Sequence, residues 1–158
     1  MAEFTYNPVQ LVQPNQAAIL NDSIRCPKGY VLHRNESGLV TLRGVVNNPC
    51  ARSARYQVTA NGNIAVPTDG TVGPIAVALA IDGEPIQTSR AIVTPAAVAP
   101  APPSTENYFN VTSTAIIDVA CGCCVQVSLE NVSQGATTAD PAPAINIQNL
   151  NVTVTRIA

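Results

Sequence analysis

The chain has 158 residues, of which 11% are charged, and its formal net charge is −2. This length suits one domain that buries about two thirds of the unfolded surface. Because a weakly negative chain lacks the basic field that holds phosphates or anionic lipid, we expect neither a nucleic acid nor a membrane as a partner. The scarcity of Lys and Glu predicts that part of the surface is covered in an assembly.

The first segment, residues 1–16, contains Pro8 and Pro14 among polar residues. Proline has no backbone N–H to donate, so we expect an extended arm that lies on a neighbour or stays loose. The segment has no basic region followed by an apolar stretch, which argues against a signal peptide. The longest apolar run, residues 75–81, is too short to span a membrane.

From residue 17 onward, apolar and polar side chains alternate in short segments rich in β-branched residues, as in strands with one buried face. We predict strands over residues 17–25, 29–34, 38–46, 55–67, 73–81, 84–93, 107–119, 123–132 and 144–156. Asp82-Gly83 predicts a two-residue hairpin turn, and Asn61-Gly62 predicts a turn or a bulge in a long strand. Residues 75–81 are apolar on both faces, so their small face, Ala76, Ala78 and Ala80, is expected against another chain or a close-packed layer.

Two segments interrupt the strands, residues 94–107 and 134–143. Both are rich in proline, which cannot donate to a strand ladder, so we predict long loops, and loops of this length are often functional. Nine strands without a helix indicate an all-β sandwich or barrel. We predict a jelly-roll β-sandwich over residues 17–158; an immunoglobulin-like sandwich is less well supported because the chain has no tryptophan.

The five cysteines are Cys26, Cys50, Cys121, Cys123 and Cys124. If successive strands alternate in direction, all five lie at one end of the sandwich with the C-terminus, and both proline-rich loops lie at the other. Three states stay open: a zinc site, a disulfide that joins Cys26 or Cys50 to the Cys121–Cys124 cluster, and free buried thiols. The odd count leaves at least one thiol without a partner in the same chain.

Residues suited to catalysis are scarce. His33 is the only histidine, its nearest hydroxyl is Ser37, and no Gly-x-Ser-x-Gly motif marks that serine as a nucleophile. Asp82 and Glu84 flank a turn, which already explains them. The seven arginines are scattered along the sequence, which fits interfacial ion pairs or plain solubility. We therefore expect no enzyme, no metal and no cofactor.

Three stretches together carry a resemblance: His33 to Gly44, Gly73 to Pro85, and Tyr108 to Val111 leading to the cysteine-rich turn. They resemble small virion proteins of Firmicutes phages and prophages, which are similar in architecture to tumour-necrosis-factor and complement-type jelly rolls. The resemblance implies a homotrimer that decorates a phage head or forms a head appendage, made in the bacterial cytoplasm and located in the virion. The partner it implies is the major capsid protein or another virion protein.

In this interpretation the N-terminal arm contacts the capsid through its apolar and aromatic residues, Phe4, Tyr6, Pro8, Val9 and Leu11. An alternative is a carbohydrate- or receptor-binding module of a phage or bacterial surface fibre. That module would use the loops at residues 94–107 and 134–143 to bind a surface glycan.

Overall fold

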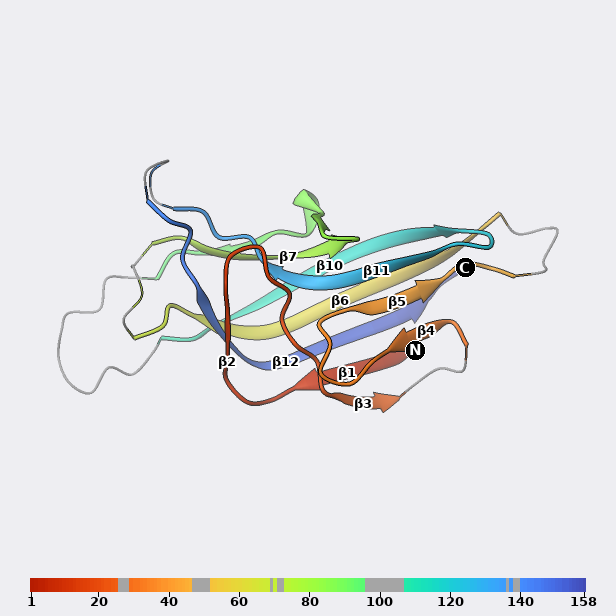
Figure 1. Ribbon diagram of the computed structural model, residues 1–158, viewed down its shortest axis with the longest axis horizontal. Helices are drawn as coiled ribbons and strands as arrows, with labels where there is room; N and C mark the ends of the chain where they lie inside the picture. Colours follow the sequence, from red (N-terminus) through yellow and green to blue (C-terminus); the bar gives the residue numbers. More distant parts are fainter. Residues whose placement is uncertain are drawn as a thin grey trace.

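The computed structural model describes residues 1–25, 29–46, 52–68, 70, 73–95, 107–135, 137 and 140–158. These residues form two antiparallel sheets packed face to face (Figure 1). One sheet has the strand order β10-β6-β12-β1-β3, with β2 paired to β12, and is called sheet A. The other, sheet B, has the order β4-β5-β11-β7-β8, with β9 paired to β7. The predicted all-β sandwich is confirmed.

The strands of each sheet come from both halves of the chain. Sheet A contains β1 (Ala2–Tyr6), β2 (Gln10–Val12), β3 (Asp22–Arg25), β6 (Ser53–Ala65), β10 (Phe109–Ala120) and β12 (Ile145–Arg156). Sheet B contains β4 (Val31–His33), β5 (Val40–Arg43), β7 (Ile75–Ile81), β8 (Glu84–Pro85), β9 (Ala91–Val93) and β11 (Cys124–Asn131). A short 3₁₀ helix, η1 (Gln87–Ser89), joins β8 to β9.

The core lies between the sheets and follows the predicted alternation. In β6, Ala54, Tyr56, Val58 and Ala60 are buried while the residues between them are exposed or half-buried. The opposite face of sheet A is therefore turned away from sheet B, and its side chains reach the surface.

The N-terminal segment is not a free arm, and this expectation was wrong. β1 lies inside sheet A between β12 and β3, with Phe4 opposite Val152 and Ser23. Ala2 and Phe4 are completely buried, because their side chains fill the core and their backbone completes the ladder of β12. The two prolines fall in the joints on either side of β2, which leaves both strands free to pair. The domain thus extends over residues 1–158.

β7 is buried on both faces, as its composition predicts. Ile75, Val77 and Leu79 belong to the core. Ala76, Ala78 and Ala80 are at most 1% exposed in the single chain. Of the two predicted surroundings, a close-packed layer of the same chain is the one observed.

Of the two turn signals, Asp82-Gly83 is confirmed, and the prediction of a turn or bulge at Asn61-Gly62 within its own strand was wrong. Asp82 and Gly83 both have positive φ, 51° and 85°, as a type I′ hairpin requires. Asn61-Gly62 lies inside the long strand β6, and the bulge is in its partner β12, between Gln148 and Asn151. Asn149 has a φ of 52° there, a conformation that asparagine tolerates.

The two ends of the sandwich differ as the direction of the strands predicts. The turn between β10 and β11 lies beside the C-terminal residues, and residues 140–144, which lead into β12, lie at the opposite end (Figure 1). Backbone hydrogen bonds from Cys121 N to Arg52 O (2.8 Å) and from Arg55 N to Ala158 O (2.9 Å) hold the first end together. Cys26, Cys50 and most of the loop over residues 94–107 lie outside the described residues.

Candidate functional site

The outward face of sheet A carries a layer of neutral polar side chains, which we call the Asn/Thr face. It contains nine asparagines and threonines in three adjacent strands: Thr59, Asn61, Asn63, Asn110, Thr112, Thr114, Asn151, Thr153 and Thr155. Strand register aligns them in rows across β10, β6 and β12, such as Thr114, Thr59 and Thr153. Ile116, which is 64% exposed, lies in the next row opposite Gln57.

Hydrogen bonds between side chains order this face. Asn61 Nδ2 donates to Thr112 Oγ1 at 2.8 Å, and Asn110 Nδ2 donates to Asn63 Oδ1 at 3.1 Å. Thr114 Oγ1 donates to Thr59 Oγ1 at 3.2 Å. Because these groups on β6 and β10 satisfy one another, covering this part of the face costs less free energy than covering unpaired amides and hydroxyls would cost.

Charges occur only at the borders of the Asn/Thr face among the described residues. At one border, Arg55 donates from Nε and Nη2 to the two carboxylate oxygens of Asp118, at 2.7 and 2.9 Å. This hydrogen bonding lowers the pKa of Asp118. At another border, Asn151 Nδ2 donates to Glu3 Oε1 at 2.6 Å. The centre of the face is therefore uncharged.

The second candidate surface is the end that contains the β10–β11 turn. It is formed by residues 43–46, 52–55, 120–124 and 156–158, and we call it the cysteine pole. Cys121, Cys123 and Cys124 are exposed and free, so the expectation of buried thiols was wrong for these three. A disulfide from this cluster to Cys26 or Cys50 stays a prediction, because both of those residues lie outside the described part of the chain.

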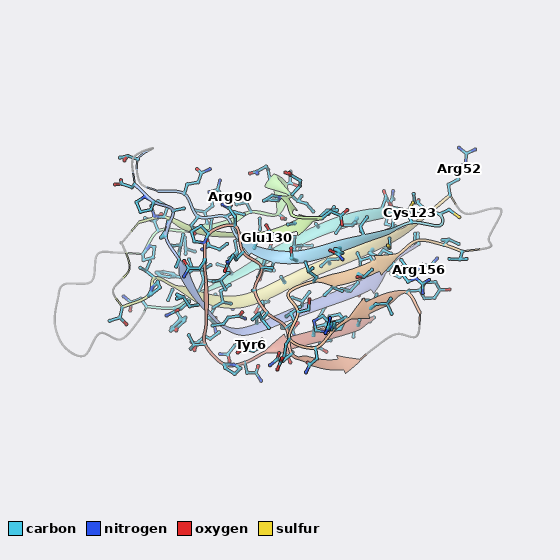
Figure 2. All side chains as sticks on the ribbon, viewed as in Figure 1. Tyr6, Arg52, Arg90, Cys123, Glu130 and Arg156 are labelled. Carbon is cyan, nitrogen blue, oxygen red and sulfur yellow. The ribbon has the colours of Figure 1, made fainter. Side chains whose placement is uncertain are left out.

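Arginines that are scattered in the sequence gather at the cysteine pole. Arg43 ends β5 opposite Cys124, the backbone oxygen of Arg52 accepts a hydrogen bond from Cys121, and Arg156 ends β12. Figure 2 shows Arg52, Cys123 and Arg156 at the same end of the molecule. Among the described carboxylates, only Asp118 forms an ion pair, and its partner is Arg55. The pole is therefore basic although the chain is weakly acidic.

Aromatic residues attach this pole to the core. The buried Tyr56 hydroxyl donates to Arg43 O at 2.5 Å, and burial raises the pKa of Tyr56. The Arg156 guanidinium lies 4.4 Å from the centre of the Tyr30 ring, a cation–π contact. Tyr30, Val46 and Ile157 also expose 46%, 60% and 47% of their surface here.

The residues considered for catalysis have structural roles. The ring of His33 packs against Phe4 with centroids 4.7 Å apart, and its Nε2 lies 2.9 Å from Ser37 O. Ser37 Oγ accepts a hydrogen bond from Leu39 N, and Asp82 Oδ1 accepts one from Gln126 N. The buried Glu130, labelled in Figure 2, accepts a hydrogen bond from Ser128 Oγ at 2.8 Å. Across the described residues, no three His, Cys, Asp or Glu side chains are grouped as metal ligands.

The five predicted capsid-contacting residues do not form one surface. Phe4 is in the core, and Tyr6 packs against it. Pro8, Val9 and Leu11 remain exposed, the last two by 51% and 56%. Sequence reasoning did not identify the Asn/Thr face, although a signal for it exists: the polar positions of β10 and β12 alternate as Asn or Thr rather than as charged residues.

Comparisons with known proteins identify the fold and nothing narrower. No family model matches the chain, and no curated protein matches it by sequence. The globular domain of the zebrafish complement 1qA protein is similar in structure, with a TM-score of 0.53 and 13% identity, over 96% of this chain and 94% of that chain. The chain has a complement-type, tumour-necrosis-factor-like jelly-roll fold.

The predicted fold class is thereby confirmed. A weaker likeness, with a TM-score of 0.40 and 15% identity, is to the C-terminal domain of EclA, a sugar-binding protein; it covers 94% of this chain and 79% of that chain. The described residues include no helix with the length and apolarity needed to cross a bilayer.

Proposed function

We propose that the protein is a non-catalytic structural component of a phage virion, a homotrimer that decorates the head or forms a head appendage. The observation that carries the self-association is the Asn/Thr face. It is a continuous face of three long strands, its centre bears no charge, and its side chains on β6 and β10 are already hydrogen-bonded to one another. The virion role rests on the sequence resemblance.

Symmetry explains why such a face suits self-association. Around a three-fold axis, each side chain near the axis meets its own copies, so a charged residue there would repel itself. Neutral Asn and Thr avoid this repulsion, and Ile116 adds apolar area that is removed from water on contact. The fixed side-chain network also loses less conformational entropy on binding than mobile side chains lose.

The experiment is the mass of the purified chain in solution, measured by light scattering after gel filtration. We expect three times the 16.4 kDa chain mass for the unmodified protein. Ile116→Asp should give monomers, because three carboxylates would be placed in the interface. Ile92→Asp is the matched control: Ile92 is 56% exposed on β9 of sheet B and should leave the trimer intact. A monomeric unmodified protein would rule out the trimer.

The contact with the capsid is a second part of the proposal and has a test of its own. Since Phe4 is buried, the remaining candidates from the N-terminal segment are the exposed Val9 and Leu11. They flank Gln10, whose side chain forms hydrogen bonds with the backbone of Ile19. Because side chains alternate along an extended chain, Val9 and Leu11 point to the other side. Leu11→Asp should abolish binding to capsid particles and leave the trimer unchanged, whereas Val46→Asp, at the cysteine pole, should bind normally. Equal binding by both variants would exclude this contact.

The glycan-binding alternative depends on the loops at residues 94–107 and 134–143, which are described only in part. No contact among the described residues favours glycan binding. A glycan array tests this alternative, and binding of the purified protein to the array would support glycan binding in place of decoration.

A further inference from the structure

The β10–β11 turn presents three thiols on a rigid backbone. Gly122 has a φ of 75° and Cys123 N donates to Ala120 O at 3.1 Å, so residues 120–123 form a type II turn. Further backbone bonds from Cys121 N to Arg52 O, Gly122 N to Val45 O and Gly44 N to Cys123 O fix it to neighbouring segments. The three cysteine side chains are exposed on this frame.

The surroundings of these thiols are positively charged. Arg43 and Cys124 are direct cross-strand partners, so their Cβ atoms lie about 5 Å apart and their side chains share a face. Arg52 is attached to Cys121 through the backbone. Both arginines are exposed, and neither has an ion-pair partner among the described carboxylates. A small anion that approaches the turn therefore meets uncompensated positive charge.

We propose that this turn is a thiol-modification site selective for small anionic disulfides, such as the oxidised forms of carboxylate-bearing low-molecular-weight thiols. A cysteine thiolate attacks one sulfur of the incoming disulfide, a new S–S bond to the protein forms, the old S–S bond breaks, and the other half leaves as a thiolate. The proton lost by the cysteine is taken up by solvent or by the leaving thiolate. The incoming disulfide is the oxidant.

Because the number of cysteines is odd, at least one thiol of the chain stays available for reaction. If Cys26 and Cys50 each form a disulfide with a cysteine of the turn, one of the three turn thiols is still free. The arginines attract the anionic reagent and hold it near this thiol, which raises the rate of encounter, and salt screens the effect.

The test compares oxidised glutathione, which is anionic, with cystamine, which is cationic, on the reduced full-length chain. Because the two reagents differ in intrinsic reactivity, each rate is divided by the rate for the chain unfolded in urea. At low salt we expect this folded-to-unfolded rate ratio to be about tenfold higher for oxidised glutathione than for cystamine. At high salt the ratio for glutathione should fall toward one. Peptide mapping of acid-quenched samples should place the first adducts on Cys121, Cys123 or Cys124.

Two sets of variants separate charge from exposure. Arg43→Gln combined with Arg52→Gln should lower the glutathione ratio about threefold or more and leave the cystamine ratio unchanged or raised. Arg34→Gln, an exposed arginine of the β4–β5 turn, is the matched control and should change neither ratio. Equal ratios for the two reagents, first adducts on Cys26 or Cys50, or a fast reaction that survives replacement of all three turn cysteines by serine would each overturn the proposal.

Discussion

Tyr56 is the largest fully buried side chain, and it connects the core to the cysteine pole. Its hydroxyl donates a hydrogen bond to Arg43 O at 2.5 Å. Tyr56→Phe should keep the packing but leave this carbonyl without that donor, so we expect the free energy of unfolding to fall by about 1–2 kcal/mol. Urea unfolding followed by circular dichroism measures this. Tyr30→Phe, on a half-exposed ring, should change stability little, and an equal loss in both variants would contradict this role.

Asp118 and Arg55 form an exposed pair whose behaviour with pH follows from its geometry. The hydrogen bonds from Arg55 hold the pKa of Asp118 below its ordinary value of 3.8. A lowered pKa means that the stabilisation is complete above the ordinary value and disappears as the pH falls through the folded-state value.

Nuclear magnetic resonance titration of the Asp118 carboxyl group checks this. In Arg55→Gln we expect its pKa to rise toward the ordinary range. A pKa of Asp118 that is the same in both proteins would show that the pair does not persist in solution.

At the scale of elements, the turn that leads from β10 in sheet A to β11 in sheet B depends on close backbone approach at Gly44. A Cβ atom there would lie 1.9 Å from Ala120 O and 2.9 Å from Ala120 C, both backbone atoms that cannot move alone. Gly44→Ala should therefore detach the β10–β11 turn from the end of β5 and lower the free energy of unfolding by about 3 kcal/mol or more.

Gly122→Ala is the informative comparison, since a Cβ atom there meets nothing within 4 Å but its φ of 75° disfavours any side chain. We expect a loss of only about 1–2 kcal/mol for this variant. Both values come from the same denaturant titration, and a Gly44→Ala protein as stable as Gly122→Ala would contradict the steric argument.

Most strands could be predicted because their information is local. The alternation in β6, β10 and β12 and the Asp82-Gly83 turn depend only on neighbours in sequence. β1 could not be predicted this way, because its partner β12 is more than a hundred residues away. In addition, Pro8 favoured the prediction of a loose arm. Asn61-Gly62 predicted a turn or a bulge in its own strand, but the bulge lies in the opposite strand at Asn149, because its position depends on the register between β6 and β12.

The candidate surfaces show the same limit. The alternating direction of successive strands predicted that the Cys121–Cys124 cluster lies at one end with the C-terminus, as observed. The clustering of Arg43, Arg52 and Arg156 could not be inferred, because it arises only when an end of β5 in sheet B and ends of β6 and β12 in sheet A meet at one end of the sandwich. The Asn/Thr face required the register between strands as well as their alternation.

For the molecule as a whole, the position of β1 changes how the N-terminus can be tested. Deleting residues 1–16 would remove a strand from inside sheet A, so a loss of function would report unfolding. Phe4→Ala should lower the free energy of unfolding by about 3–5 kcal/mol, because its ring is completely buried. Leu11→Ala, at a 56% exposed site, should cost less than about 0.5 kcal/mol. Thermal unfolding of the two variants tests this, and similar melting temperatures would contradict it.

The pairing of β1 with β12 joins two strands that lie more than a hundred residues apart in the chain. During synthesis, β1 and β6 must wait without their common neighbour until residue 156 has left the ribosome, and until then their unpaired edges can bind other chains. Sheet A is therefore completed only after β12 has been synthesised. A nascent chain that stalls before β12 should be sensitive to proteases and prone to aggregation, and the full-length chain should close the sheet in one late step.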